Sequence, residues 1–227
     1  MPIAFSGNGL ITTANATFSN AIVMTNNSLL ATANAGFIEY NGTSMYFTPA
    51  GTQRGVVPGM QMFVMGSPGF TGQNATGNQS IFGLTNGVTL SSNTIYHFEF
   101  MFVLGKSAGT TSHGYSMGFT GTATNNFILY DIHMNAQPSL NISSSGPYYT
   151  AGSQTTPFTV WGTTSLATVY SIFQGHGSIS VNSGATFLPV YALSAAPGGA
   201  YTTQPGSYML IYPIGTGTAN VSIGTWA

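Results

Sequence analysis

Apolar and polar residues alternate along most of the chain in short runs, and Gly, Pro, Asn, Ser and Thr separate these runs. The clearest run covers residues 96–104. Because successive side chains of a strand point to opposite faces, one face of this run would carry Tyr96, Phe98, Phe100, Phe102 and Leu104. The opposite face starts at His97 and is half apolar. A strand with this much apolar surface on both faces belongs inside a sandwich or at a subunit interface.

Further short strands are predicted along the chain, and no window keeps a helical apolar period. The Asn41-Gly42 pair indicates a two-residue hairpin turn. This density of short strands and turns predicts an all-β fold, a jelly-roll-like β-sandwich. The predicted strands are Gly36–Tyr40, Ser44–Thr48, Gln61–Met65, Ser80–Leu84, Tyr115–Phe119, Phe127–His133, Phe158–Trp161, Thr168–Phe173, Gly177–Val181, Thr186–Ala192 and Ser207–Tyr212.

Changes in pattern along the chain predict its organisation. Residues 1–35 have scattered apolar positions, which suits an extended N-terminal arm or small subdomain that packs on a neighbour. Residues 36–137 form a first β-rich half and 158–227 a second. The connection between them, 138–157, either divides two small β subdomains or forms a loop within one sandwich.

Charge is almost absent from the 227 residues: charged side chains make up 2% of them, against roughly 25% in an ordinary soluble domain. The apolar fraction of 43% is high enough to drive collapse, so disorder does not follow. A net charge of −1 promotes association. Two cations, Arg54 and Lys106, cannot build the electrostatic surface that nucleic acid or an anionic membrane requires. The partners that remain are copies of this chain and other proteins.

The titratable residues are few enough to test for chemistry one by one. Asp131 and His133 share a strand face, but a metal site would need a third ligand such as His97 or Glu99. A polar strand face or a contact at a trimer axis is the alternative interpretation. We therefore predict no metal, no cofactor and no catalytic residue, since no nucleophile elbow or carboxylate pair accompanies the many serines.

Two residues are predicted to be structural for an electrostatic reason. Glu39 lies within an apolar strand, and a buried carboxylate is tolerated only when it is paired. Arg54 is the natural partner. Glu39 and Arg54 thus join Asp131, His133 and the aromatic residues Tyr96, Phe98, Phe100 and Phe102 as candidates for structural or interface roles.

The ends and the apolar runs bear on localisation. The start of the chain lacks a charged segment followed by an apolar stretch, so we expect no secretory signal and synthesis in a cytoplasm. No run approaches about 18 apolar residues, so we expect no transmembrane helix.

Several motifs resemble a β-rich module of structural proteins in tailed-phage virions. The run 35–49, AGFIEYNGTSMYFTP, followed by RGVV at 54–57, is similar to an AGAIEYDG-x-x-FYFTP stretch and its RGVV element. The likeness continues through 80–90, 96–102, 106–124 and 177–206 and ends near Pro213. The sequence departs from the module at Asn41, where Asp is usual, and in its very few charges.

The resemblance implies a non-enzymatic protein located in the virion. The module often ends long tail fibres, but here it forms nearly the whole chain beside a short N-terminal arm. We therefore expect a homotrimeric outer capsid decoration or cement protein, bound to the major capsid protein and stabilising the head. The alternative is a short tail-fibre or tail-tip protein that contacts tail proteins and a host surface glycan or protein receptor.

Overall fold

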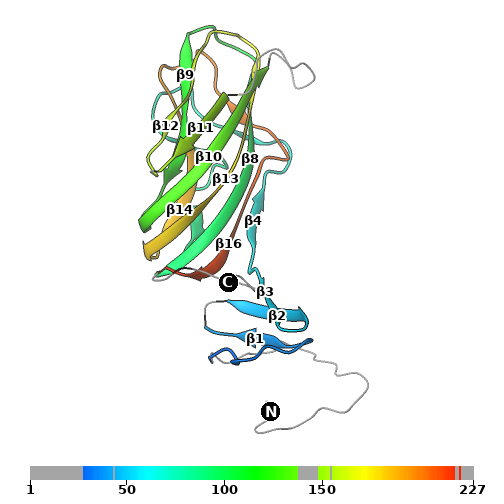
Figure 1. Cartoon of the computed structure of the whole chain (residues 1–227). Coiled ribbons are helices and arrows are strands. Elements are labelled where there is room, and N and C mark those ends of the chain that lie inside the picture. The colour runs from blue at the N-terminus through cyan, green and yellow to red at the C-terminus, as the bar shows by residue number, and fades with distance from the viewer. Residues whose placement is uncertain (1–27, 43, 138–147, 154, 218–219, 221–227) are drawn as a thin grey trace, which may run out of the picture.

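The computed structural model describes residues 28–42, 44–137, 148–153, 155–217 and 220, and these residues form strands and no helix. The predicted all-β sandwich is confirmed. Two antiparallel sheets pack face to face, and a separate three-stranded sheet lies beyond one end of them (Figure 1). Among the described residues there is accordingly no helix that is long and apolar enough to span a membrane.

The larger sheet of the sandwich has eight strands built around β8. β13 pairs with β8 over its whole length, β10 pairs with β13, and β16 pairs with the other side of β8. The strands of the larger sheet are β4 (Gln61–Val64), β5 (Phe70–Thr71), β8 (Thr94–Lys106), β10 (Thr124–Gln137), β11 (Tyr148–Gly152), β13 (Val169–Ser183), β15 (Thr202–Thr203) and β16 (Tyr208–Thr216).

The second sheet has five strands, with β9 between β12 and β14. Its members are β6 (Gln79–Ser80), β7 (Val88–Thr89), β9 (His113–Thr120), β12 (Phe158–Thr164) and β14 (Thr186–Leu193). Both sheets combine strands from before and after residues 138–157, so residues 61–137 and 158–216 form one sandwich, while residues 38–57 of the predicted first half form a separate sheet.

Aromatic side chains from both sheets fill the space between them. Phe98 of β8 is fully buried and meets Phe119 of β9 edge to face, at 5.2 Å between ring centroids. Phe119 in turn stacks on Phe187 of β14. Glycines make room for these rings, because a Cβ on Gly175 of β13 would lie 2.5 Å from the ring of Phe100 on the paired strand.

The third sheet consists of β1 (Ile38–Tyr40), β2 (Met45–Ala50) and β3 (Gln53–Val57), hereafter the small sheet. Its strands pair only with one another in the order β1-β2-β3. The chain then leaves β3 through Pro58 and Gly59 and enters the sandwich at β4. In Figure 1 the small sheet lies below the sandwich, and β4 runs along the sandwich edge above it.

Several sequence predictions need correction. Only Ser80 of the predicted strand 80–84 is in a strand, because the following residues turn at Gly83 with φ 71°. The predicted strands 168–173 and 177–181 are one continuous strand, β13. The hairpin at Asn41-Gly42 exists, but the pairing of Tyr40 with Met45 makes its loop longer than two residues. The predicted connection 138–157 contains β11, and β3 was not predicted as a strand.

Most of the predicted N-terminal arm, residues 1–27, lies outside the described residues. The remainder, 28–35, packs on the small sheet, where Ala33 is buried. This short segment therefore belongs to the small sheet and not to the sandwich.

Candidate functional site

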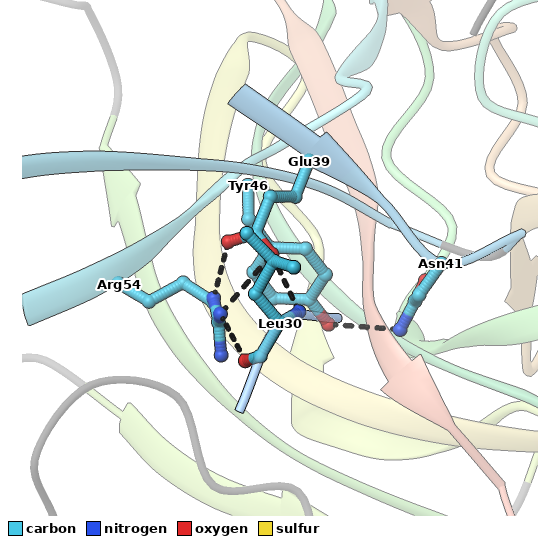
Figure 2. A network of polar contacts seen from close by, with 5 residues as sticks. All are labelled: Leu30, Glu39, Asn41, Tyr46 and Arg54. Carbon is cyan, nitrogen blue, oxygen red and sulfur yellow. Dashed lines mark hydrogen bonds and ion pairs between the residues drawn. The ribbon is translucent and has the colours of Figure 1, made fainter. Parts of the chain in front are cut away.

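The ion pair between Glu39 and Arg54 is present and holds the small sheet to the segment before it. Arg54 Nε lies 2.8 Å from Glu39 Oε2, and Arg54 Nη2 lies 3.1 Å from Glu39 Oε1. The same guanidinium donates to the Leu30 carbonyl at 2.9 Å, and the Leu30 N–H donates to Glu39 Oε1 at 2.9 Å. Figure 2 shows this closed set of contacts, in which two backbone groups of one residue meet both charges. It ties residues 28–35 onto β1 and β3.

The network favours the ionised form of Glu39. The Leu30 N–H, followed by the Arg54 side chain, lowers the pKa of the Glu39 carboxyl. Tyr46 and Asn41 extend the polar face, since Asn41 Nδ2 donates to Tyr46 Oη at 3.3 Å (Figure 2). The face of the small sheet that residues 28–35 cover is thus its polar one.

A second polar group lies on the outer face of the larger sheet. Asp131 and His133 of β10 do share a strand face, with His133 Nε2 at 2.9 Å from Asp131 Oδ2. His176 of β13 pairs with Asp131 across the strands, and its Nδ1 lies 3.1 Å from Asp131 Oδ1. His97 and Glu99 of β8 continue the group, at 3.3 Å between Nε2 and Oε1. We call these five residues the histidine face.

The histidine face gathers most of the histidine, aspartate and glutamate side chains of the protein. It holds three of the four histidines and two of the three carboxylates. The partner that each imidazole meets is a carboxylate, so the face offers hydrogen-bond donors and acceptors to a polar ligand or a neighbouring protein. Among the described residues, no three His, Cys, Asp or Glu side chains are arranged to hold a metal ion.

The aromatic candidates of β8 lie inside the sandwich. Tyr96, Phe98, Phe100 and Phe102 are each at most 4% exposed and belong to the core of this chain. The alternation predicted from the sequence is correct, and it places His97 and Glu99 on the outer face. Of the two roles expected for these rings, the structure shows that of core residues.

A set of buried hydrogen bonds in the core, which links Ser171, Tyr115, Tyr201 and His113 and is hereafter called the tyrosine network, was not predicted. Ser171 Oγ donates to Tyr115 Oη at 2.8 Å, and Tyr115 Oη donates to Tyr201 Oη at 2.6 Å. Tyr201 Oη lies 2.7 Å from His113 Nε2, while His113 Nδ1 lies 2.6 Å from the Thr111 carbonyl. Because a carbonyl only accepts, Nδ1 carries the proton and Nε2 accepts from Tyr201. With a neutral imidazole, every polar group of the tyrosine network then has a hydrogen-bond partner.

Burial determines the ionisation state of the side chains in the tyrosine network. Desolvation lowers the pKa of His113 and raises the pKa of Tyr115 to about 12. Both shifts favour the neutral forms that the hydrogen bonds require. Tyr115, Tyr201, His113 and Ser171 are all fully buried, so their hydrogen bonds stabilise the core of the sandwich.

Lys106 at the end of β8 is the second cation of the protein, and it is only 4% exposed. Its Nζ donates to the carbonyl groups of Ala108, Gly109, Leu166 and Ala167. Desolvation lowers the pKa of this amine. Lys106 therefore ties the loop after β8 to the loop before β13 and offers no charge to a partner.

An apolar groove of about 210 Å³ lies beside β4. Met62 and Phe63 of β4 line one side, and Phe187 and Pro189 of β14 line the other. β4 pairs only with β16, so its second edge is open, and all four of its residues are exposed. An open edge strand with apolar side chains favours contact with another chain.

No family model matches the chain, and no curated protein matches it.

Proposed function

We propose that this chain is a structural protein of a bacteriophage virion, a trimeric outer capsid decoration protein that stabilises the head by packing between subunits. One observation carries the proposal: large apolar side chains, among them Ile38, Met60, Met62 and Val64, are at least half exposed on a chain that is 2% charged. A free monomer with such a surface associates, because neither charge nor polar cover keeps it apart. The resemblance of residues 35–213 to the phage virion module is the reason for proposing a phage particle as the site of assembly.

The polar groups support a role in assembly. Both cations are engaged within the chain, Arg54 with Glu39 and Lys106 with backbone carbonyls. Partner contact therefore involves neither cation and depends on apolar burial and on hydrogen bonds. Such an interface holds best when many symmetric copies surround a particle.

A short tail-fibre or tail-tip protein is the second candidate, and the layout of the molecule favours it. The small sheet lies beyond one end of the sandwich, which is the arrangement of an attachment base and a distal head (Figure 1). In that role the histidine face would be available to a host glycan or receptor protein.

Copy number in the purified particle tests both candidates. A cryo-electron microscopy reconstruction, with quantitative mass spectrometry against the major capsid protein, would show hundreds of copies for a shell protein and about a dozen for a tail protein. Absence from the particle would refute both. Deletion of residues 1–30 provides a second test, since the truncated protein should still trimerise but no longer bind particles.

A further inference from the structure

The histidine face lies at the centre of the larger sheet, where β10, β13 and β8 run side by side (Figure 1). Residues that pair directly in an antiparallel sheet point to the same side. The strand register therefore aligns one row of outward side chains across β16, β8, β13 and β10: Leu210, Glu99, His176 and Asp131. Neighbouring strands lie about 4.8 Å apart, so the four strands give a platform roughly 14 Å wide.

Two hollows on this platform share the side chain of His176. Their volumes are about 360 and 430 Å³, within the range of about 300–1,000 Å³ in which proteins hold small ligands. Side chains that line the first hollow include Glu99, His133, Gln174 and Tyr208. Side chains that line the second include His97, Leu129, Asp131 and Ser178. The His176 side chain is 66% exposed, so a ligand in either hollow can reach it.

The charges of the two hollows exclude an anionic ligand. Among the described residues that line them, Glu99 and Asp131 carry negative charge, and none carries positive charge while the histidines are neutral. Arg54 is paired with Glu39, and Lys106 is buried at the end of β8. A phosphate, sulfate or carboxylate group would be repelled here. A purely apolar ligand would take water away from these polar groups and give them no hydrogen bond in return. A neutral polar ligand remains.

The hydrogen-bonding groups of the hollows suit hydroxyl groups. Because a carboxylate only accepts, the proton in the contact between His176 and Asp131 lies on His176 Nδ1, which leaves Nε2 of the neutral ring as an acceptor. The first hollow thus combines two acceptors, Glu99 and His176 Nε2, with the amide donor of Gln174. The second combines Asp131 with the hydroxyl of Ser178. A hydroxyl group both donates and accepts, whereas an ammonium or guanidinium group only donates. A ligand with several hydroxyl groups therefore uses both kinds of partner.

Ring surfaces lie beside the polar centre. The Tyr212 ring of β16 lies 5.4 Å from the His97 ring, measured between centroids, and Tyr208 of the same strand lines the first hollow. Leu129, on the opposite side of the platform, lines the second hollow and is 60% exposed. A sugar ring has C–H groups on its faces and hydroxyl groups around its rim. It can pack a C–H face on these apolar surfaces while its hydroxyl groups reach the polar centre.

We propose that the histidine face binds a neutral saccharide across β8, β13 and β10, with His176 between two adjacent sugar rings. Glu99 and Asp131 accept hydrogen bonds from the sugar hydroxyl groups, and the tyrosines of β16 contact the ring faces. The proposal rests on the second candidate function only for the source of the saccharide, a host surface.

A glycan array tests the chemical class of the ligand. The labelled full chain is applied to immobilised neutral oligosaccharides, to sialylated and sulfated oligosaccharides, and to oligolysine peptides. At least one neutral oligosaccharide should bind, and the acidic ones should not. The absence of any neutral binder, or equal binding of neutral and acidic oligosaccharides, overturns the proposal. Binding of oligolysine alone also overturns it, because the carboxylates would then be a site for cations.

Substitutions test the location of the site, with isothermal titration of the strongest neutral oligosaccharide found on the array. His176→Ala and Asp131→Asn should each weaken binding at least about tenfold. Asn182→Ala is the matched control, because Asn182 is exposed on the same strand, β13, and lines neither hollow. It should change the affinity less than about twofold. Unchanged amide exchange in β8 and β13 shows that each variant has folded. Equal affinities of the control and the two site variants refute the site.

The saccharide site and the virion role can fail separately. If the pure protein binds a neutral saccharide through the histidine face but is absent from the particle, the virion proposal fails and the site stands. If the protein is present in the particle but binds no neutral saccharide, the site fails and the virion role stands.

Discussion

Replacing Tyr201 by Phe tests whether the tyrosine network stabilises the sandwich. The Tyr201 side chain is fully buried, and its hydroxyl is the central group between Tyr115 and His113. Tyr201→Phe keeps the ring and removes both contacts at once. His113 Nε2 then loses its donor, and the Tyr115 hydroxyl loses its acceptor.

The expected loss follows from leaving two buried groups unsatisfied. Each such group costs about 1–3 kcal/mol, so the free energy of unfolding should fall by roughly 2–6 kcal/mol. Tyr191→Phe is the matched control, because Tyr191 is 1% exposed and donates one hydrogen bond to Gln79 Oε1 at 3.0 Å. That oxygen keeps the Gln73 N–H at 2.6 Å, so the control should lose only about 0.5–1.5 kcal/mol.

Urea unfolding at pH 7.5, followed by tryptophan fluorescence at one fixed protein concentration, measures both variants. The slopes should agree with that of the wild type, since the same surface is exposed on unfolding. Tyr201→Phe should have the lower midpoint. If the free energies of unfolding of the two variants differ by less than about 0.5 kcal/mol, the tyrosine network does not stabilise the sandwich as argued.

Three further predictions concern groups described above. Because burial lowers the pKa of His113, its contribution to stability is complete above the unfolded-state pKa of about 6.5. That contribution is lost as the pH falls below this value, so the urea midpoint should drop between pH 7 and 5 more steeply in the wild type than in His113→Gln. Lys106→Met leaves four carbonyls without their donor and should cost about 1–3 kcal/mol, with faster amide exchange in the loop after β8. Gly175→Ala places a Cβ 2.2 Å from the Asp131 carbonyl oxygen, whereas Gly162→Ala meets nothing within 4 Å. Only the first should lower the thermal midpoint by more than about 5 °C, and equal midpoints would contradict the close packing of β10 on β13.

The sequence allowed local features to be predicted well. The alternation from Tyr96 to Leu104 identified the buried face of β8, since period two is a property of the strand alone. The Glu39–Arg54 pair was predictable because so few charges exist that a carboxylate in an apolar strand has few partners. Both inferences needed only neighbouring residues or a count.

Features that depend on strand order were not predictable. The histidine face forms because β13 lies between β10 and β8, which brings His176 beside both Asp131 and Glu99. No local pattern specifies that order. The tyrosine network also depends on strand order, because its residues come from distant parts of the sequence.

The exposure of Met45 and Phe47 on the small sheet was missed for a different reason. Alternation in β2 separates Met45 and Phe47 from Tyr46, but it does not say which set is covered. The usual assumption that apolar side chains point inward is wrong here, because residues 28–35 lie on the side of Tyr46. Only the observed contacts of Leu30 with Glu39 and Arg54 determine the orientation.

The order of the strands along the chain also sets the order in which the molecule can fold during synthesis. The small sheet needs no residue beyond Val57. The edge of β8, in contrast, stays open until β16 has been made, and the Val103 N–H must wait for Ser207, whose Oγ accepts it at 3.0 Å. Ribosomes following one another on a message thus carry finished small sheets while every sandwich is still incomplete.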